Sequence, residues 1–84
     1  MHSRHSISLF DTTQRLSALA PGACGTVLRV HAESGGADRL AALGVTIGAR
    51  IRVLQTTPAF VFECDRTELA VERAVAHAIV VTVS

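Results

Sequence analysis

Two side chains in the first half of the chain have the spacing of a metal-binding pair. His31 and Glu33 lie two residues apart in a stretch expected to be extended, so both side chains point to the same side. Such a pair can bind a borderline cation such as Zn²⁺ or Fe²⁺ if a third group converges on it. That third group could be Cys64, Glu63 or His77. A site of His31, Glu33 and Cys64 is therefore one hypothesis, and an ordinary solvated surface pair is the other.

The other reactive residue types do not form a catalytic pattern. Gly35 and Gly36 are not followed by Lys and then Ser or Thr, so there is no phosphate-binding loop. Ser, His and Asp are scattered, without a nucleophile elbow. Cys24 and Cys64 have no C-x-x-C partner, which speaks against a zinc ribbon or a thioredoxin-type motif, and each is expected to be a buried structural thiol. We expect a protein that is not an enzyme and that requires no cofactor.

Composition disfavours several kinds of partner. The eight basic residues are all Arg, and with seven Asp and Glu the net charge is +1, so no strong field attracts nucleic acid or anionic lipid. Three Phe with no Trp or Tyr cannot build the aromatic-lined groove that binds polyproline. The sequence has no signal peptide and no apolar run near the ~20 residues needed to span a bilayer. We expect a cytoplasmic protein with reduced thiols.

The length of 84 residues allows one domain, which would bury roughly 60–65% of its unfolded surface. Residues 1–8 are polar and include His2 and His5, so they are expected to form a mobile tail ahead of a folded domain at 9–84. His2 and His5 could bind metal adventitiously.

The elements that would position these residues are mostly short strands. Alternation and β-branched residues predict strands at 25–33, 49–55, 59–64, 68–72 and 78–83, with a hairpin turn at 65–67. One short helix is expected within 12–19, one of about two turns at 37–43, and one helical turn at 73–77. The last strand carries no charge, as expected of a strand that closes a barrel. Together these elements predict a small, strongly bent antiparallel barrel whose closure removes exposed edges.

The stretch from Gly36 to Arg52 joins the central helix to the next strand through a tight corner. Gly44 follows the last apolar residue of the helix, and Gly48 precedes the strand. The solvent side of this corner is the candidate partner-binding surface, formed by Arg39, Ala42, Val45, Thr46 and Ile47. An exposed Val45 or Ile47 beside an arginine would suit a small, transient interface. The alternative is that both of these side chains belong to the core.

Three ordered blocks of the sequence resemble the FeoA family, ferrous iron transport protein A. The segment from Leu16 to Val30 resembles the family's L-x-x-L-x-P-G-x-x-G-x-(I/V)-x-x-(I/V) opening, and Arg39 to Val53 resembles its R-L-x-x-(L/M)-G-(L/V)-x-x-G-x-x-(I/V)-x-V centre. Leu69 to Val81 fits its closing block. The chain departs from the family between its second and third predicted strands, where Thr57-Pro58-Ala59 replaces the A-P-x-G-x-P turn of many members.

The resemblance implies an SH3-like barrel and a cytoplasmic accessory role in ferrous iron uptake. The implied partner is the FeoB permease, which carries a cytosolic G-protein domain, and the corner described above is the hypothetical contact surface. The same module occurs at the end of metal-dependent repressors, but this chain has no helix-turn-helix and resembles the stand-alone form. A small Fe²⁺- or Zn²⁺-binding module involved in metal sensing is the alternative function.

Overall fold

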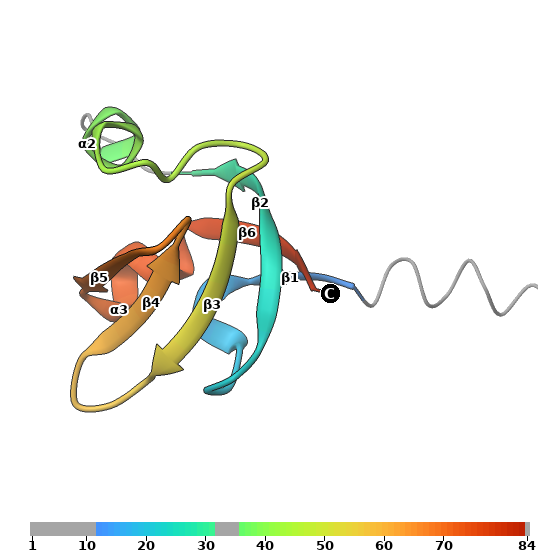
Figure 1. Ribbon diagram of the computed structural model, residues 1–84, viewed down its shortest axis with the longest axis vertical. Coiled ribbons are helices and arrows are strands. Elements are labelled where there is room, and N and C mark those ends of the chain that lie inside the picture. Colours follow the sequence, from blue (N-terminus) through green and yellow to red (C-terminus); the bar gives the residue numbers. More distant parts are fainter. Residues whose placement is uncertain (1–11, 32–35, 84) are drawn as a thin grey trace, which may run out of the picture.

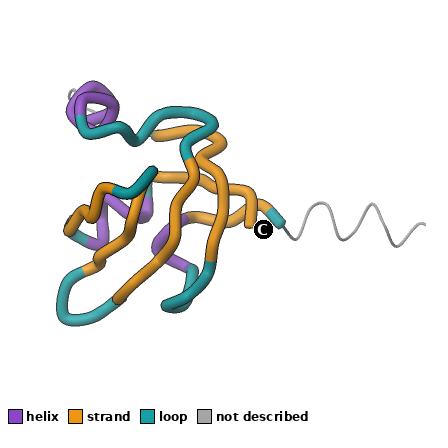
Figure 2. Tube along the Cα trace, in the orientation of Figure 1, coloured by secondary structure: helices purple, strands orange, loops and turns teal. Residues whose placement is uncertain are grey.

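The computed structural model describes residues 12–31 and 36–83. Six strands make up most of it: β1 (Thr13–Arg15), β2 (Cys24–Val30), β3 (Arg50–Gln55), β4 (Phe60–Cys64), β5 (Thr67–Val71) and β6 (Ile79–Val83). A 3₁₀ turn, η1 (Leu16–Ala18), and two short helices, α2 (Gly36–Ala42) and α3 (Arg73–His77), connect them (Figures 1 and 2). The predicted tail at 1–8 and the last two residues of the strand predicted at 25–33 lie outside the described residues.

The strands form one antiparallel sheet in the order β1-β6-β2-β3-β4-β5. The five predicted strands are confirmed with ends shifted by a few residues, and so are the helix before β3 and the helical turn before β6. The predicted hairpin turn is a two-residue turn at Asp65 and Arg66, which both have positive φ, the geometry of a type I′ turn. The mainly β prediction is therefore confirmed.

The sheet is curved, but the expected closure of the barrel was wrong. Within the described residues, β1 pairs only with β6 and β5 only with β4, so the two ends of the sheet do not join. The uncharged strand β6 does not close a ring: it lies between β1 and β2. Its lack of charge follows from burial of Ile79, Val80 and Val81 in the interior of the sheet.

The helix expected within 12–19 was also wrong in part. Residues Thr13–Arg15 form strand β1, whose partners are Thr82, Val81 and Val80 of β6, and only Leu16–Ala18 make a helical turn. A short helix here would use only the backbone groups of neighbouring residues, whereas β6 offers a whole row of backbone partners once the chain has folded. Pairing with β6 satisfies more backbone groups than a short helix would.

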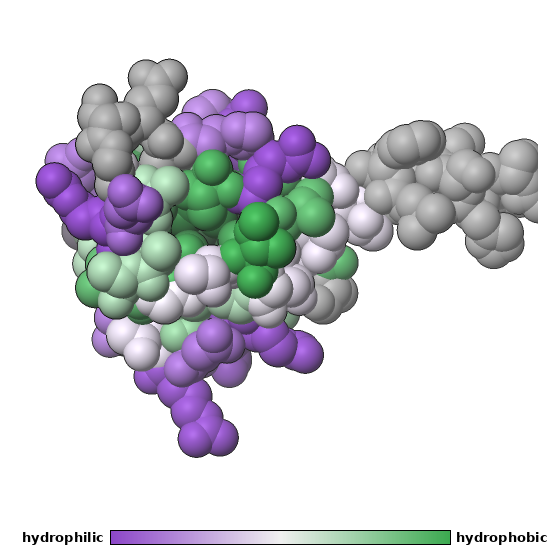
Figure 3. All heavy atoms as spheres, turned by 90° about the horizontal axis from the view of Figure 1, so that it is seen from above, coloured by the Kyte–Doolittle hydropathy of each residue, from purple (hydrophilic) through white to green (hydrophobic). Residues whose placement is uncertain are grey.

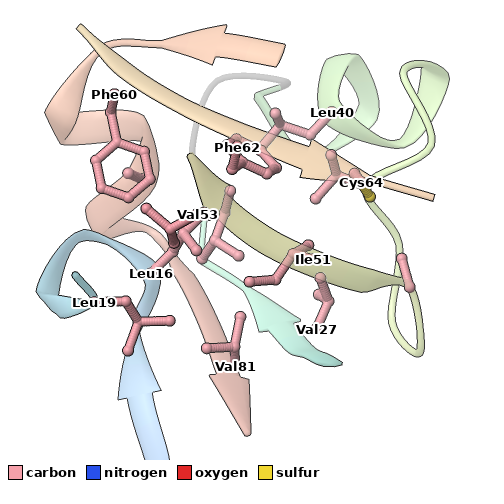
Figure 4. Packing of buried hydrophobic residues seen from close by; sticks show 14 residues of the cluster. Leu16, Leu19, Val27, Leu40, Ile51, Val53, Phe60, Phe62, Cys64 and Val81 are labelled. Carbon is pink, nitrogen blue, oxygen red and sulfur yellow. The ribbon is translucent and has the colours of Figure 1, made fainter. Parts of the chain in front are cut away.

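The core lies inside the curve of the sheet. It contains Phe60 and Phe62 from β4, alternating residues of β3, Leu16 and Leu19 from the first turn, and Leu40 from α2 (Figure 4). In the described ranges no polar or charged residue is buried. The core thus consists mainly of small and branched aliphatic side chains together with two phenylalanines, as the composition indicates.

Candidate functional site

The end of α2 is held by two hydrogen bonds around Gly44. The amide of Gly44 donates to the Ala41 carbonyl at 3.0 Å, and the amide of Val45 donates to the Leu40 carbonyl at 2.9 Å. With Gly44 at φ +98°, this is the Schellman pattern of a helix C-terminus. The pattern commonly packs the residue after the glycine against the one five positions earlier, here Leu40, and both side chains are buried.

A second turn follows directly and lifts Ile47 into solvent. The Ala49 amide donates to the Thr46 carbonyl at 3.0 Å, and Gly48 has φ +93°, so residues 46–49 form a type II turn with Ile47 at its first central position. The turn is anchored to β2, because the Gly48 amide donates to the Val27 carbonyl and the Val27 amide donates to the Ala49 carbonyl, both at 2.8 Å. Ile47 is 75% exposed at the tip of this anchored turn.

The structure separates the five residues predicted to bind a partner into two groups. Arg39, Ala42, Thr46 and Ile47 are exposed, whereas Val45 is only 1% exposed. Val45 is therefore unavailable to a partner, because the helix C-terminus turns its side chain onto Leu40. The prediction that at least one of Val45 and Ile47 is exposed is confirmed, because Ile47 is exposed and Val45 is not.

Sequence reasoning missed Leu43, which is not among the five residues predicted to bind a partner. The helix ends at Ala42, and Leu43 is 49% exposed. The sequence did contain a usable pattern, Leu40-x-x-Leu43-Gly44-Val45, because the Schellman motif buries the first and last of these residues. We call Arg39, Ala42, Leu43, Thr46 and Ile47 the corner surface. Seen from this end, hydrophobic side chains gather in the middle of the face, with hydrophilic ones around them (Figure 3).

A groove opens beside the corner surface, between α2 and the segment that joins β5 to α3. Its volume is about 640 Å³, and its lining includes Leu40, Leu43, Val71 and Val75 with Arg39 and Glu72. The groove is largely apolar and has one cationic and one anionic side chain in its lining. Its lining comes from two parts of the sequence about thirty residues apart, so no local pattern indicates it.

The described residues of the hypothetical metal site do not converge. The strand register places Cys64 opposite Ile51 of β3, and Ile51 opposite Gly25 of β2. His31 comes six residues after Gly25, so it lies beyond the far end of β2 from the position level with Cys64. Glu33 lies outside the described residues. Of the other two candidate ligands, His77 Nδ1 lies 3.3 Å from Ser17 Oγ, and Glu63 projects from β4 beside Arg52. No group of three or more His, Cys, Asp or Glu side chains within 12–31 and 36–83 is arranged to hold a metal ion.

Cys64 is a buried thiol with a hydrogen bond of its own. Its side chain is 1% exposed, and its thiol donates to the Gly44 carbonyl at a sulfur–oxygen distance of 3.5 Å. Burial, with a smaller contribution from the Asp65 carboxylate, raises the pKa of this thiol. A metal ligand must be a thiolate, so these conditions favour the structural role expected for Cys64. Neither cysteine is in a disulfide, and Cys24 is partly exposed, so the expected burial is confirmed for Cys64 and was wrong for Cys24.

Comparison with solved structures places the fold among small SH3-like domains. The FeoA protein from Chlorobium tepidum is 32% identical, with a TM-score of 0.79, over 83% of this chain and 70% of that chain. Stenotrophomonas maltophilia FeoA in complex with zinc, described as an SH3 domain protein, is 26% identical, with a TM-score of 0.70, over 79% of this chain and 86% of that one. The IdeR protein of T. acidophilum shares the fold at 23% identity and a TM-score of 0.78, but only 34% of its chain is covered.

The family follows from the sequence match. The model of the FeoA domain matches residues 14–83, which is most of the chain, so this protein belongs to the FeoA family. No curated protein matches the chain at the level of sequence. In the part of the chain that the structure describes, no helix combines the length and apolar character needed to cross a membrane.

Proposed function

We propose that this chain is a non-enzymatic accessory protein of ferrous iron uptake that acts by contacting the cytosolic G-protein domain of a FeoB-type permease. Proteins of the FeoA family take part in ferrous iron transport, which supports the general role. The contact is made through the corner surface. The cytoplasm, where such a G-protein domain lies, is then the site of action.

The observation that carries this proposal is the exposure of Ile47 on an anchored turn. An isoleucine that is 75% exposed leaves apolar area in water, and covering it gains about 25 cal/mol per Å². Leu43, at 49% exposure, extends the apolar area, while Arg39 and Thr46 supply polar groups around it. A small apolar centre with a polar rim is the composition of a transient protein interface.

The anchoring of the turn matters as much as its composition. Ile47 is presented by a type II turn that is tied to β2 by two hydrogen bonds, through Gly48 and Ala49, so little conformational entropy is lost when a partner covers it. The helix C-terminus that precedes the turn is equally fixed by Gly44 and Val45. The corner surface is therefore largely preorganised for binding.

The test is a calorimetric titration of the protein with the purified cytosolic domain of a FeoB-type permease, with and without guanine nucleotide. Ile47→Ala should weaken binding about tenfold, since it removes roughly 1–2 kcal/mol of apolar contact. Leu54→Ala is the matched control, because Leu54 is also an exposed aliphatic residue, at 37%, but lies on β3. Leu54→Ala should leave the affinity unchanged.

Arg39→Glu supplies a second test through charge, and it should slow association more than it speeds dissociation. Val45 is not a suitable site for testing the interface, because its substitution would damage the core. Equal binding by the wild type, Ile47→Ala and Arg39→Glu proteins, all folded, would rule out the corner surface as the contact.

A further inference from the structure

Strand β5 leaves one edge of the sheet open. Among the described residues it pairs only with β4 and has no strand partner on its other side (Figure 1). Thr67, Glu68 and Ala70 are exposed. The strand contains neither proline nor a β-bulge, which are devices that commonly block an edge.

The hydrogen-bond phase of the sheet shows which groups face this edge. The Asp65 amide donates to the Arg50 carbonyl of β3 at 3.1 Å, so the backbone groups of Asp65 and, two residues earlier, Glu63 point toward β3. Those of Cys64 and Phe62 then point toward β5, where their partners are Thr67 and Leu69. A two-residue hairpin turn requires the same phase, with Cys64 and Thr67 as a hydrogen-bonded pair.

It follows that the N–H and C=O groups of Glu68 and Ala70 point away from β4, toward the open edge. In an antiparallel pair, residues alternate between those that bond the neighbour and those that face the other side. Glu68 lies opposite Glu63, and Ala70 lies opposite Val61, both in the non-bonded positions. Two donors and two acceptors are thus presented in a row, at the spacing that an added strand needs.

The side chains around this edge specify what the added strand should carry. On the outer face, Glu68 lies directly opposite Glu63, which has Arg52 of β3 on its other side. Glu68 is therefore the acidic side chain next to the open edge. On the inner face, Leu69 and Val71 point toward the core, and Val71 lines the apolar groove together with Leu43 and Val75. A strand beside β5 would place alternate side chains against Glu68 and against this groove.

We propose that the β5 edge binds an extended segment of another protein in which basic and apolar residues alternate. The backbone of the segment bonds to Glu68 and Ala70, and its basic side chains lie on the outer face beside Glu68, with Glu63 one strand further in. Its apolar side chains lie on the inner face, where the one opposite Val71 enters the groove. The inference concerns the mode of binding and the chemistry of the segment, and it holds whichever protein supplies that segment.

A second copy of this chain is a poorer occupant of the edge. An antiparallel β5–β5 pair centred on Glu68 would place Glu68 against its own copy, and one centred on Ala70 would place Glu68 against Glu72. A pair centred on Leu69 would place Glu68 against Ala70, without a basic side chain opposite Glu68. Like charges directly opposite each other on a sheet are destabilising. Two of the three registers thus oppose like charges and none places a basic side chain opposite Glu68, whereas a basic strand does so, which makes the basic strand the better occupant.

The probe is the capped peptide Lys-Val-Lys-Val-Lys-Val, added to the full chain and followed by amide hydrogen exchange. In the free protein the amides of Glu68 and Ala70 should exchange fast, while those of Thr67 and Leu69 are protected by β4. Saturating peptide should slow exchange at Glu68 and Ala70 by at least tenfold. Unchanged exchange at these two amides would overturn the proposal, and the peptide Glu-Val-Glu-Val-Glu-Val should not bind.

N-methylation of the peptide tests the backbone geometry directly. The lysines lie opposite Glu68 and Ala70, so methylating the amide of the central lysine removes a donor that faces β5 and should weaken binding about tenfold. Methylating a valine amide, which faces away from β5, should change binding less than about twofold. Equal effects of the two modifications would overturn the proposal.

Two variants of the protein complete the test. Ala70→Pro removes an outward-facing N–H without breaking the ladder with β4, so binding should be lost while the fold is kept. Glu68→Lys should weaken binding of the basic peptide about fivefold and should allow the acidic peptide to bind. This charge swap tests the proposal even if Ala70→Pro does not fold. If the wild-type protein binds the basic peptide but does not bind the permease domain, the proposed function is refuted and the present inference is not.

Discussion

The amide of Val45 donates to the carbonyl of Leu40 across the end of α2, and the two side chains are buried against the same core. This single relationship fixes where the helix ends and which residues of the corner are available. Because Val45 turns inward, the chain must turn outward again at Thr46 and Ile47. The exposed apolar tip is thus a consequence of how the helix terminates.

Replacing Gly44 by alanine should destabilise the protein by about 1–2 kcal/mol. Gly44 has φ +98°, and a Cβ added there would meet no heavy atom within 4 Å, so the cost comes from the backbone conformation and not from crowding. Urea denaturation measures the change. Gly44→Asn should cost less, because asparagine tolerates positive φ better than alanine. Equal stability of the wild type and Gly44→Ala proteins would contradict the described helix terminus.

Gly25→Ala should be destabilising for a different reason, by about 1–3 kcal/mol. A Cβ at Gly25 would lie 2.6 Å from the carbonyl oxygen of Thr82, a backbone atom that cannot move without separating β2 from β6. Thr26→Ala, at the next position of the same strand, is the control and should cost less, since Thr26 is only partly buried. Thermal unfolding of the two variants compares them, and a Gly25→Ala protein with an unchanged Tm would disprove this close approach.

Truncation of the core should distinguish the body of the sheet from the docking of α2. Val53→Ala and Leu40→Ala should each lower the free energy of unfolding by about 2–4 kcal/mol, because the side chains are 0% and 6% exposed. Leu40→Ala should also speed amide exchange in α2, where Leu40 is the buried contact, whereas Val53→Ala should not do so selectively. Leu54→Ala, on the outer face of β3, should stay within about 0.5 kcal/mol of the wild type.

The raised pKa of the Cys64 thiol predicts a loss of stability in alkali. The folded protein holds this proton more tightly than the unfolded chain does, because the site is buried and lies near Asp65. The stabilisation is complete below the ordinary thiol pKa and is lost as the pH rises through the raised pKa of the folded state. Urea denaturation gives the free energy of unfolding of the wild type and Cys64→Ala proteins between neutral pH and pH about 10. The wild type should lose more stability than Cys64→Ala as the pH rises.

A thiol reagent provides an independent check of the same site. At neutral pH, Cys24, which is partly exposed, should react first, and Cys64 should react only at the rate at which the protein opens. Rapid modification of both thiols in the folded protein would show that Cys64 is not buried as described.

Much of the fold could be predicted because the information is local. Alternating apolar residues in β3 and β4, and the two-residue turn at Asp65 and Arg66, determine those strands from neighbouring positions alone. The same holds for α2 and for the turns at Gly44 and Gly48. The family resemblance rested on these local blocks, and the match to residues 14–83 confirmed it.

The candidate site was only partly predictable, because exposure depends on what packs against a residue. Ile47 and Val45 are similar side chains two residues apart, yet one is 75% and the other 1% exposed. The difference comes from the hydrogen bonds that end the helix. Likewise, Leu43 became part of the surface because the helix ended one residue earlier than expected.

By itself, the sequence determined a nearly neutral, mainly β domain with short helices at known places, since periodicity and turn residues act over a few neighbours. Only the tertiary structure decided that Thr13–Arg15 is a strand, that β6 lies inside the sheet, and that β5 ends it. Each of these depends on which distant strand supplies the backbone partners. That choice is made by burial of the whole core, and no local pattern encodes it.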